Sequence, residues 1–316
     1  MGKPYYLSRN ESDIAKAILI LLISFGHNHF LCPKGDLRNY FYLFHVIGFF
    51  ILPFFYDRPA IISKDRILNT IVRNWVPYTW TVLACWVVYS LLTHDFAFGL
   101  GHVWAYINGS QSSLRNYFGF IFPWFLPAFC TFSIILMFAK KYKWFLCIVT
   151  LLGIWTFFWT KESFFEYKNI IPFGLVHAIR FFALGVITFY TCYFVKWIKY
   201  VGTAGFVVLT CLYWINPLGL PYKVLLPITF FMLVLTIIPL CNAKIMRIIG
   251  QNSLFIYLSN MFIINTLYQA LPHTIVNGII TFIASVILPI VIMEFVIKKI
   301  RPLNRILFPR DWHFNV

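Results

Sequence analysis

Long apolar segments, separated by short polar or basic breaks, run through almost the whole of this 316-residue chain. Hydrophobic residues make up 60% of it and charged residues 11%, which is more apolar surface than a soluble domain can bury. The pattern predicts an all-α, polytopic integral membrane helical bundle with about ten transmembrane helices, forming one domain over residues 1–316. We expect helices near residues 14–31, 40–56, 70–93, 118–139, 144–160, 170–195, 200–215, 222–241, 248–270 and 274–297.

The net charge of +16 is accounted for by membrane topology. If both termini and alternate loops are cytoplasmic, nineteen Lys and Arg residues fall on that side and six on the other. This bias predicts an even number of spans with both termini inside, and nucleic acid is not expected as a partner. The cytoplasmic set is Lys3, Arg9, Lys16, Arg58, Lys64, Arg66, Arg73, Lys140, Lys141, Lys143, Lys196, Lys199, Lys244, Arg247, Lys298, Lys299, Arg301, Arg305 and Arg310, and the outer set is Lys34, Arg38, Arg115, Lys161, Lys168 and Lys223.

Lys16 and His27 are eleven residues apart in the first apolar segment, which places them on one helix face, about three turns and about 16 Å apart. Ionisable groups at membrane depth are costly and usually face a bundle interior or a wet cavity, so this face is the candidate functional site. Imidazole titrates near neutral pH, so His27 suits a general base. A histidine solvated at the outer interface is the alternative.

Other ionisable residues lie in apolar segments farther along the chain. His45 is either a second active-site histidine or a core residue bonded to a backbone carbonyl. His177 and Arg180 are three residues apart and share a helix face. At that depth Arg180 needs a partner, which is either Glu294 or an anionic ligand, and Glu294 also has Lys298 one turn away.

The link between the second and third predicted helices is basic, with Lys64, Arg66 and Arg73 near one membrane boundary. Positive-inside topology alone produces such a cluster. Lys and Arg are also suited to binding the phosphates of a nucleotide-bearing donor, although no glycine-rich phosphate loop accompanies them.

Two further features concern the loops and the cysteines. The connection over residues 94–117 is rich in Gly, Ser, Asn and aromatic residues, which suits a loop that touches a polar ligand such as a sugar, or an ordinary surface loop. The seven cysteines include no CxxC pair and lie mostly in apolar segments, so we expect neither disulfides nor a metal site.

Several short motifs then occur in a characteristic order. The first helix carries Asp13, and then Lys16 and His27 with ten residues between them; the second begins with Phe44-His45 and ends in FFILPFF. KDRILNTIVRNWVPY, WFLPAF and IGQNSLFIYLSN follow at residues 64–78, 124–129 and 249–260. Together they resemble the acyltransferase-3 family of membrane O-acyltransferases, and most nearly its fucose-4-O-acetylase-like branch.

The chain departs from that family's pattern at three places. Pro53-Phe54 replaces a Ser-Gly pair, the paired arginines of the third helix become Arg66 and Arg73, and Asn260 stands where many members have His. These departures concern the donor site and the ninth helix, and they leave the pair of Lys16 and His27 intact.

The resemblance implies transfer of an acyl group, most simply acetyl, from cytoplasmic acyl-CoA to a hydroxyl of a cell-surface or lipid-linked saccharide in a bacterial cell inner membrane. Acetyl-CoA is then a substrate, no metal is needed, and the partners are acyl-CoA, the saccharide acceptor and membrane lipids. A polysaccharide or lipid-linked sugar transporter is the alternative, although no internal repeat supports it. The implied catalytic residues are His27, Lys16 and Asp13, the acyl-CoA-binding residues are Lys64, Arg66 and Arg73, and the substrate-binding or supporting residues are Asn28, His45, Trp124, His177, Arg180, Ser253, Tyr257 and Glu294.

Overall fold

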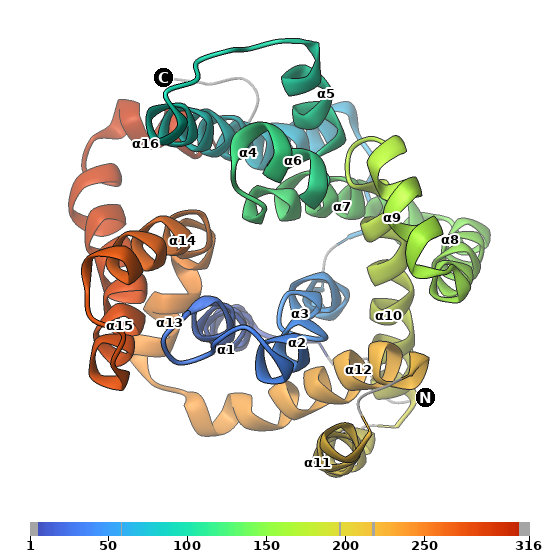
Figure 1. The fold of residues 1–316 in the computed structure, drawn as a ribbon. Coiled ribbons are helices and arrows are strands. Elements are labelled where there is room, and N and C mark those ends of the chain that lie inside the picture. Colours follow the sequence, from blue (N-terminus) through green and yellow to red (C-terminus); the bar gives the residue numbers. More distant parts are fainter. Residues whose placement is uncertain (1–5, 58, 196, 217–218, 310–316) are drawn as a thin grey trace. The chain divides into compact units, whose positions relative to one another are not determined.

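A computed structural model describes residues 6–57, 59–195, 197–216 and 219–309 (Figure 1). Regular structure in these residues is helical throughout, as predicted. The cations Lys3, Arg58, Lys196 and Arg310 of the charge count lie outside the described residues. The chain forms two compact units, each built from two separate stretches of sequence. The expectation of one domain over residues 1–316 stays a prediction.

The first unit comprises Met1–Arg58 and Leu184–Val296. Its central element is α1, which packs against α2, α3, α12, α13, α14 and α15. Most residues of α1 are buried, including its polar residues Ser12, Asp13, Ser24 and His27. The helices of this unit are α1 (Arg9–His27), α2 (Asp36–Tyr42), α3 (Ile47–Ile51), η1 (Leu52–Phe55), α11 (Ile198–Ile215), α12 (Leu220–Ile237), η4 (Ile238–Cys241), α13 (Lys244–Gln251), α14 (Ser253–Ala270), α15 (Ile275–Ile292) and most of η5 (Met293–Ile297).

The second unit comprises Pro59–Ala183 and Ile297–Val316. Within it α4 packs against α6, α7 and α16, and α7 packs against α8. α10 (Leu175–Phe194) begins in this unit and ends in the first. The other helices are α4 (Lys64–Thr93), α5 (Leu100–Asn108), α6 (Gln111–Phe118), η2 (Phe122–Trp124), α7 (Phe125–Lys141), α8 (Lys143–Trp155), η3 (Thr156–Phe158), α9 (Lys161–Ile170) and α16 (Arg301–Leu307).

Each of the ten predicted segments coincides with helix in the structure. Among the described residues, seven helical segments are long and apolar enough to cross a membrane: α2 to η1, α4, η2 with α7, α10, α11, α12 with η4, and α15 with η5. The other three predicted segments fall on α1, which carries Glu11, Asp13 and Lys16, on the shorter α8 with η3, and on α13 with α14. The chain is therefore an all-α polytopic membrane protein.

Two predicted helices are interrupted. The segment at 40–56 divides into α2, α3 and η1, because the chain turns after Tyr42 and Pro53 favours a tighter final turn. The segment at 248–270 breaks at Asn252, whose side chain bonds the carbonyl of Ile248 in the preceding turn.

The connections that the charge bias assigns to the outer side contain helices that hydropathy does not mark. α5 and α6 lie within 94–117, and α9 covers most of 161–169. Ser110 and Thr160 begin α6 and α9 by accepting hydrogen bonds from the backbone amides of Ser113 and Ser163. These connections are therefore structured elements of the second unit.

Candidate active site

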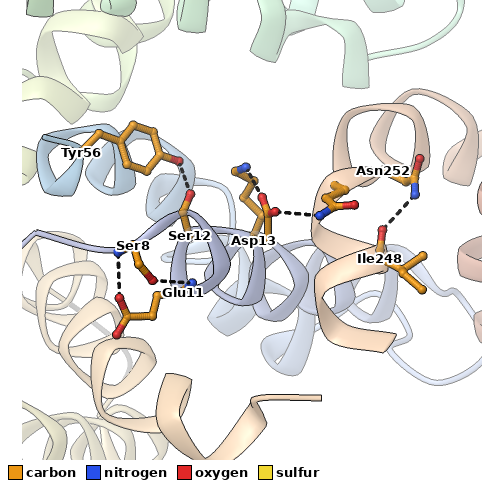
Figure 2. Close-up of polar contacts among 9 residues, drawn as sticks. Ser8, Glu11, Ser12, Asp13, Tyr56, Ile248 and Asn252 are labelled. Carbon is orange, nitrogen blue, oxygen red and sulfur yellow. Dashed lines mark hydrogen bonds and ion pairs between the residues drawn. The ribbon is translucent and has the colours of Figure 1, made fainter. Parts of the chain in front are cut away.

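The first turn of α1 is fixed by reciprocal side-chain capping. Ser8 Oγ accepts from the amide of Glu11, and the Glu11 carboxylate accepts from the amide of Ser8 (Figure 2). One turn later, Ser12 Oγ donates to the hydroxyl of Tyr56 at 3.0 Å. These contacts set the register of α1 and hold Asp13 on its buried side.

Asp13 joins α1 to α13. Its carboxylate accepts from Lys16 Nζ at 2.7 Å and from Gln251 Nε2 at 3.1 Å. The two helices approach so closely here that a Cβ on Gly250 would overlap the carbonyl oxygen of Asp13. Lys16 is thus held within the first unit by a buried carboxylate, and Asp13 is the residue that orients it.

Glu294, Ser253 and Asn260 lie on elements of the same unit. The carboxylate of Glu294 accepts from Asn252 Nδ2 at 2.9 Å, next in sequence to the Gln251 that binds Asp13. Ser253 is buried at the start of α14. Asn260 donates to Ser24 Oγ at 3.4 Å, so the residue that replaces the family's His still contacts α1.

Asn28 ends α1 and anchors it. Its Nδ2 donates to the carbonyl of Gly278 at 2.8 Å, and its Oδ1 accepts from the amides of Phe30 and Leu31. Asn28 is fully buried, and its contacts fix the position of the residue before it. That preceding residue is His27.

His27, Tyr42 and His45 form a cluster of three rings. Tyr42 Oη lies 2.9 Å from His27 Nδ1, and the His27 and His45 ring centroids are 5.8 Å apart in an edge-to-face arrangement. The Tyr42 ring is 5.0 Å from that of His45. Tyr257, on α14, is close enough to Tyr42 to interact with it electrostatically. The turn between α2 and α3 brings these side chains together.

Hydrogen bonding assigns a proton to His45. Its Nδ1 faces the carbonyl oxygen of Phe41 at 2.5 Å, and a carbonyl only accepts, so Nδ1 carries the hydrogen. In the neutral ring Nε2 is then a lone-pair acceptor, and this buried atom makes no hydrogen bond within the described residues. His45 bonds a backbone carbonyl and lies beside His27, and its role as a second active-site histidine stays a prediction.

The ring of His27 can act as a base at Nε2. Its Nδ1 is engaged by Tyr42, whereas no hydrogen bond to Nε2 is recorded among the described residues. When Nδ1–H donates to Tyr42 Oη, the lone pair lies on Nε2. Only 9% of His27 is exposed, so most of the residue is shielded from bulk solvent.

Arg38 organises the chain that follows His27. Its guanidinium donates to the carbonyl of Cys32 and, at 2.9 Å, to Nδ1 of His29. Burial, and then the charge of Arg38, lower the pKa of His29, which keeps this ring neutral and able to accept. The ring of Tyr268 packs 5.1 Å from His29 on the other side.

A second group of predicted residues lies in the second unit. The rings of Trp124 and His177 are 4.6 Å apart between centroids. Arg180 lies over the rings of Phe157 and Phe164, at 4.4 and 4.1 Å from their centroids. The structure therefore shows aromatic contacts for Arg180 and a hydrogen bond from Asn252 to Glu294, and a pairing of Arg180 with Glu294 or with an anionic ligand stays a prediction.

The predicted donor-binding cations lie near the start of α4. Ser63 caps the helix, and Arg66 donates through one nitrogen to the carbonyls of Pro59 and Ile61 at 2.8 and 3.0 Å. Arg66 and Arg73 are seven residues apart and share a face, whereas Lys64 projects from the opposite side. Arg66 thus shapes the preceding loop, while Lys64 and Arg73 are exposed.

Comparison with known proteins decides the family. A family model described as an acyltransferase domain, that of acyltransferase-3, matches residues 9–294. The chain belongs to the acyltransferase-3 family. No curated protein and no solved structure matches it. The match covers α1 to α15 and therefore includes residues of both units.

Two contacts of the site in this acyltransferase-3 protein were not expected from sequence. Tyr42 bonds His27, and Gln251 bonds Asp13. Gln251 lies beside Asn252 in the motif at 249–260, so this motif is the sequence feature that could have pointed to it. Nothing marked Tyr42, because its position depends on the turn that ends α2.

Proposed function

We propose that this acyltransferase-3 protein is an acyl-CoA-dependent O-acetyltransferase of a bacterial inner membrane, which acts on a hydroxyl of a cell-surface or lipid-linked saccharide. The observation that carries the proposal is His27, shielded at the end of the central helix, with Nδ1 on Tyr42 and Nε2 without a partner in the part of the chain that the structure describes. The family supplies the reaction class, acyl transfer. The donor and acceptor are proposals from the sequence.

In the proposed reaction, Nε2 of His27 takes the proton of the acceptor hydroxyl as its oxygen attacks the thioester carbonyl carbon. Tyr42 accepts from Nδ1–H and stabilises the imidazolium that forms. The C–O bond forms, the C–S bond breaks, and the CoA thiolate takes the proton from His27. The products are an O-acyl ester and CoA with a free thiol.

Two groups of residues are proposed to serve the donor. Lys64 and Arg73, with the amides at the start of α4, are suited to CoA phosphates, because a helix N-terminus and cationic side chains both favour anions. Lys16, oriented by Asp13, is proposed to act on the donor from α1. Arg66 contributes by holding the loop at Pro59 and Ile61 in place.

The acceptor is proposed to approach from the side opposite the termini. The excess of Lys and Arg on the assigned cytoplasmic side supports this direction. His27 is also about 21 Å along its helix from Asp13 at 1.5 Å per residue. The connection over 94–117, with α5 and α6, is proposed to contact the saccharide.

The test uses inside-out membrane vesicles from cells that express the protein, supplied with acetyl-CoA labelled in the acetyl group. The proposal predicts label in the saccharide fraction, released as acetate by mild alkali, as expected for an ester. Vesicles without the protein are the background control. Label that stays absent from saccharide while the protein is abundant would contradict the proposed acceptor, and label in saccharide without alkali release would contradict O-acylation.

A further inference from the structure

Three basic side chains converge in the second unit without a recorded acid. They are Lys168 on α9, and His177 and Arg180 on α10. Lys168 and Arg180 are close enough for their charges to act on the His177 ring. Phe164 connects them: its ring lies 4.1 Å from the Arg180 guanidinium and 5.4 Å from the His177 ring, and it is one helical turn before Lys168.

Lys168 and His177 are buried, Arg180 is half-buried, and polar atoms of His177 and Arg180 have no hydrogen-bond partner among the described residues. Lys168 is 3% exposed and His177 is 8% exposed. Both ring nitrogens of His177 and Nε of Arg180 are buried and have no hydrogen-bond partner among the described residues. Burial lowers the pKa of Lys168 to about 8, which still leaves it mainly protonated at neutral pH. Unpaired buried polar groups of this kind are costly, so a partner is expected.

The acidic residues of α9 do not fill that role. Glu162 and Glu166 are exposed, and neither is three or four residues from Lys168, so they lie on other faces of the helix. The carboxylates of this helix therefore do not pair with the Lys168 ammonium through an i, i+3 or i, i+4 contact.

The surrounding frame is rigid and aromatic. Asn108 Nδ2 donates to the backbone carbonyls of Lys168, Asn169 and Ile171, which fixes the end of α9. Ser110 Oγ donates to Asn169 Oδ1 at 2.8 Å. Trp124 lies against the His177 ring on another side. The basic groups are thus held in place before any ligand arrives, which reduces the entropy lost on binding.

We propose that Lys168, His177 and Arg180 form a binding site for an oxyanion, the carboxylate or phosphate group of a sugar acid, sugar phosphate or lipid headgroup. A guanidinium presents two parallel donors to such a group, an ammonium adds a point charge, and an imidazole adds one more donor. The aromatic faces of Trp124 and Phe164 supply apolar contact for the rest of the ligand. The proposal does not depend on the acyl transfer proposed above.

The test is equilibrium dialysis of the purified full chain in phosphatidylcholine nanodiscs with labelled glucuronate, glucose 1-phosphate or neutral glucose. We expect uptake of at least one anionic sugar and none of glucose. Arg180→Gln and Lys168→Gln should each weaken binding at least tenfold, and Arg180→Lys, which keeps the charge but loses the planar fork, should weaken it less. The matched controls are Arg115→Gln and Lys161→Gln, exposed cations of the same unit, which should bind as the wild type does.

Nanodiscs that contain phosphatidylglycerol distinguish the sources of the oxyanion. Loss of sugar-anion uptake there assigns the site to lipid headgroups, and retained uptake assigns it to a soluble or saccharide anion. Absence of anionic sugar uptake in phosphatidylcholine nanodiscs overturns the proposal. The proposal is also overturned if Arg180→Gln and Lys168→Gln leave the uptake of anionic sugar unchanged. Size-exclusion profiles identify any variant that fails to fold, in which case the other variant carries the test.

Discussion

Replacing Tyr42 by Phe removes one oxygen atom and tests whether the contact with His27 matters. The hydroxyl lies 2.9 Å from Nδ1, while the Tyr42 ring packs 5.4 Å from His27 and 5.0 Å from His45 between centroids. Phe keeps both ring contacts, so the change isolates the hydrogen bond. A hydrogen bond of this kind contributes about 0.5–1.5 kcal/mol, which corresponds to about a two- to twelvefold lower rate.

The assay is initial-rate transfer of labelled acetyl from acetyl-CoA to saccharide in membrane vesicles, normalised to the amount of protein. We expect kcat to fall within that range and the KM for acetyl-CoA to stay unchanged, because Tyr42 acts through His27. Tyr40→Phe is a matched control: Tyr40 lies on the same helix and its hydroxyl contacts Thr210 Oγ1 at 2.6 Å, away from His27. A Tyr42→Phe rate equal to wild type, or a loss shared equally by Tyr40→Phe, would refute the reasoning.

Three further changes give distinct expectations. Gly250→Ala should lower thermal stability by about 1–3 kcal/mol, measured by thermal unfolding in detergent, because its Cβ would overlap a backbone carbonyl of α1. Replacing Lys64, Arg66 and Arg73 together by Gln should raise the KM for acetyl-CoA about tenfold or more, measured by donor saturation, since charge-assisted hydrogen bonds to phosphate are lost. A cysteine at the exposed position Asp95 should react with a membrane-impermeant thiol reagent added outside intact cells, because the charge bias places that connection outside.

The donor-cation variant has a matched control, and each of the three expectations has a result that would contradict it. The control for the donor cations is the replacement of Lys140, Lys141 and Lys143 together by Gln. This variant also removes three positive charges from the assigned cytoplasmic side. Unchanged donor saturation in a correctly inserted Lys64, Arg66 and Arg73 variant would contradict their role. A Gly250→Ala protein as stable as wild type would contradict the close approach of α13. Labelling of the Asp95 cysteine only from the inner face would reverse the topology.

Cysteine labelling depends on burial that sequence did not reveal. Cys32 is fully buried, so it does not compete for the reagent, whereas Cys147 and Cys211 are exposed and are replaced first. Asn28 and Ser110, which hydropathy places at the outer boundary, are both buried and therefore make poor labelling sites. The exposed side chain of Asp95 avoids this difficulty.

Hydropathy predicts the helical segments well because each must be apolar over most of its length to lie in a bilayer. It does not predict where a segment breaks, since a break depends on local hydrogen bonds such as that of Asn252 to Ile248. Hydropathy also did not predict the helices α5, α6 and α9. α6 and α9 are too polar for the hydropathy signal and are defined by the caps of Ser110 and Thr160, whereas α5 is apolar but only nine residues long.

Sequence spacing puts Lys16 and His27 on one helix, and the structure adds partners from other elements for His27 and for Asp13, the residue that holds Lys16. Those partners depend on how distant segments pack, so spacing within a helix cannot name them. Tyr42 reaches His27 only because the chain turns between α2 and α3, and Gln251 reaches Asp13 only because Gly250 allows a close helix approach. The roles of the named site residues stay predictions.

The central claim is that Nε2 of His27 is the base for acyl transfer. The most direct measurement is the acetyl-transfer rate of His27→Ala beside His273→Ala, an exposed histidine of the same unit, with both proteins at equal abundance in membrane vesicles. The account predicts a loss of about 10²- to 10⁴-fold for His27→Ala, as expected when a general base is removed, and a rate near wild type for His273→Ala. Wild-type transfer by a folded His27→Ala protein would contradict the account.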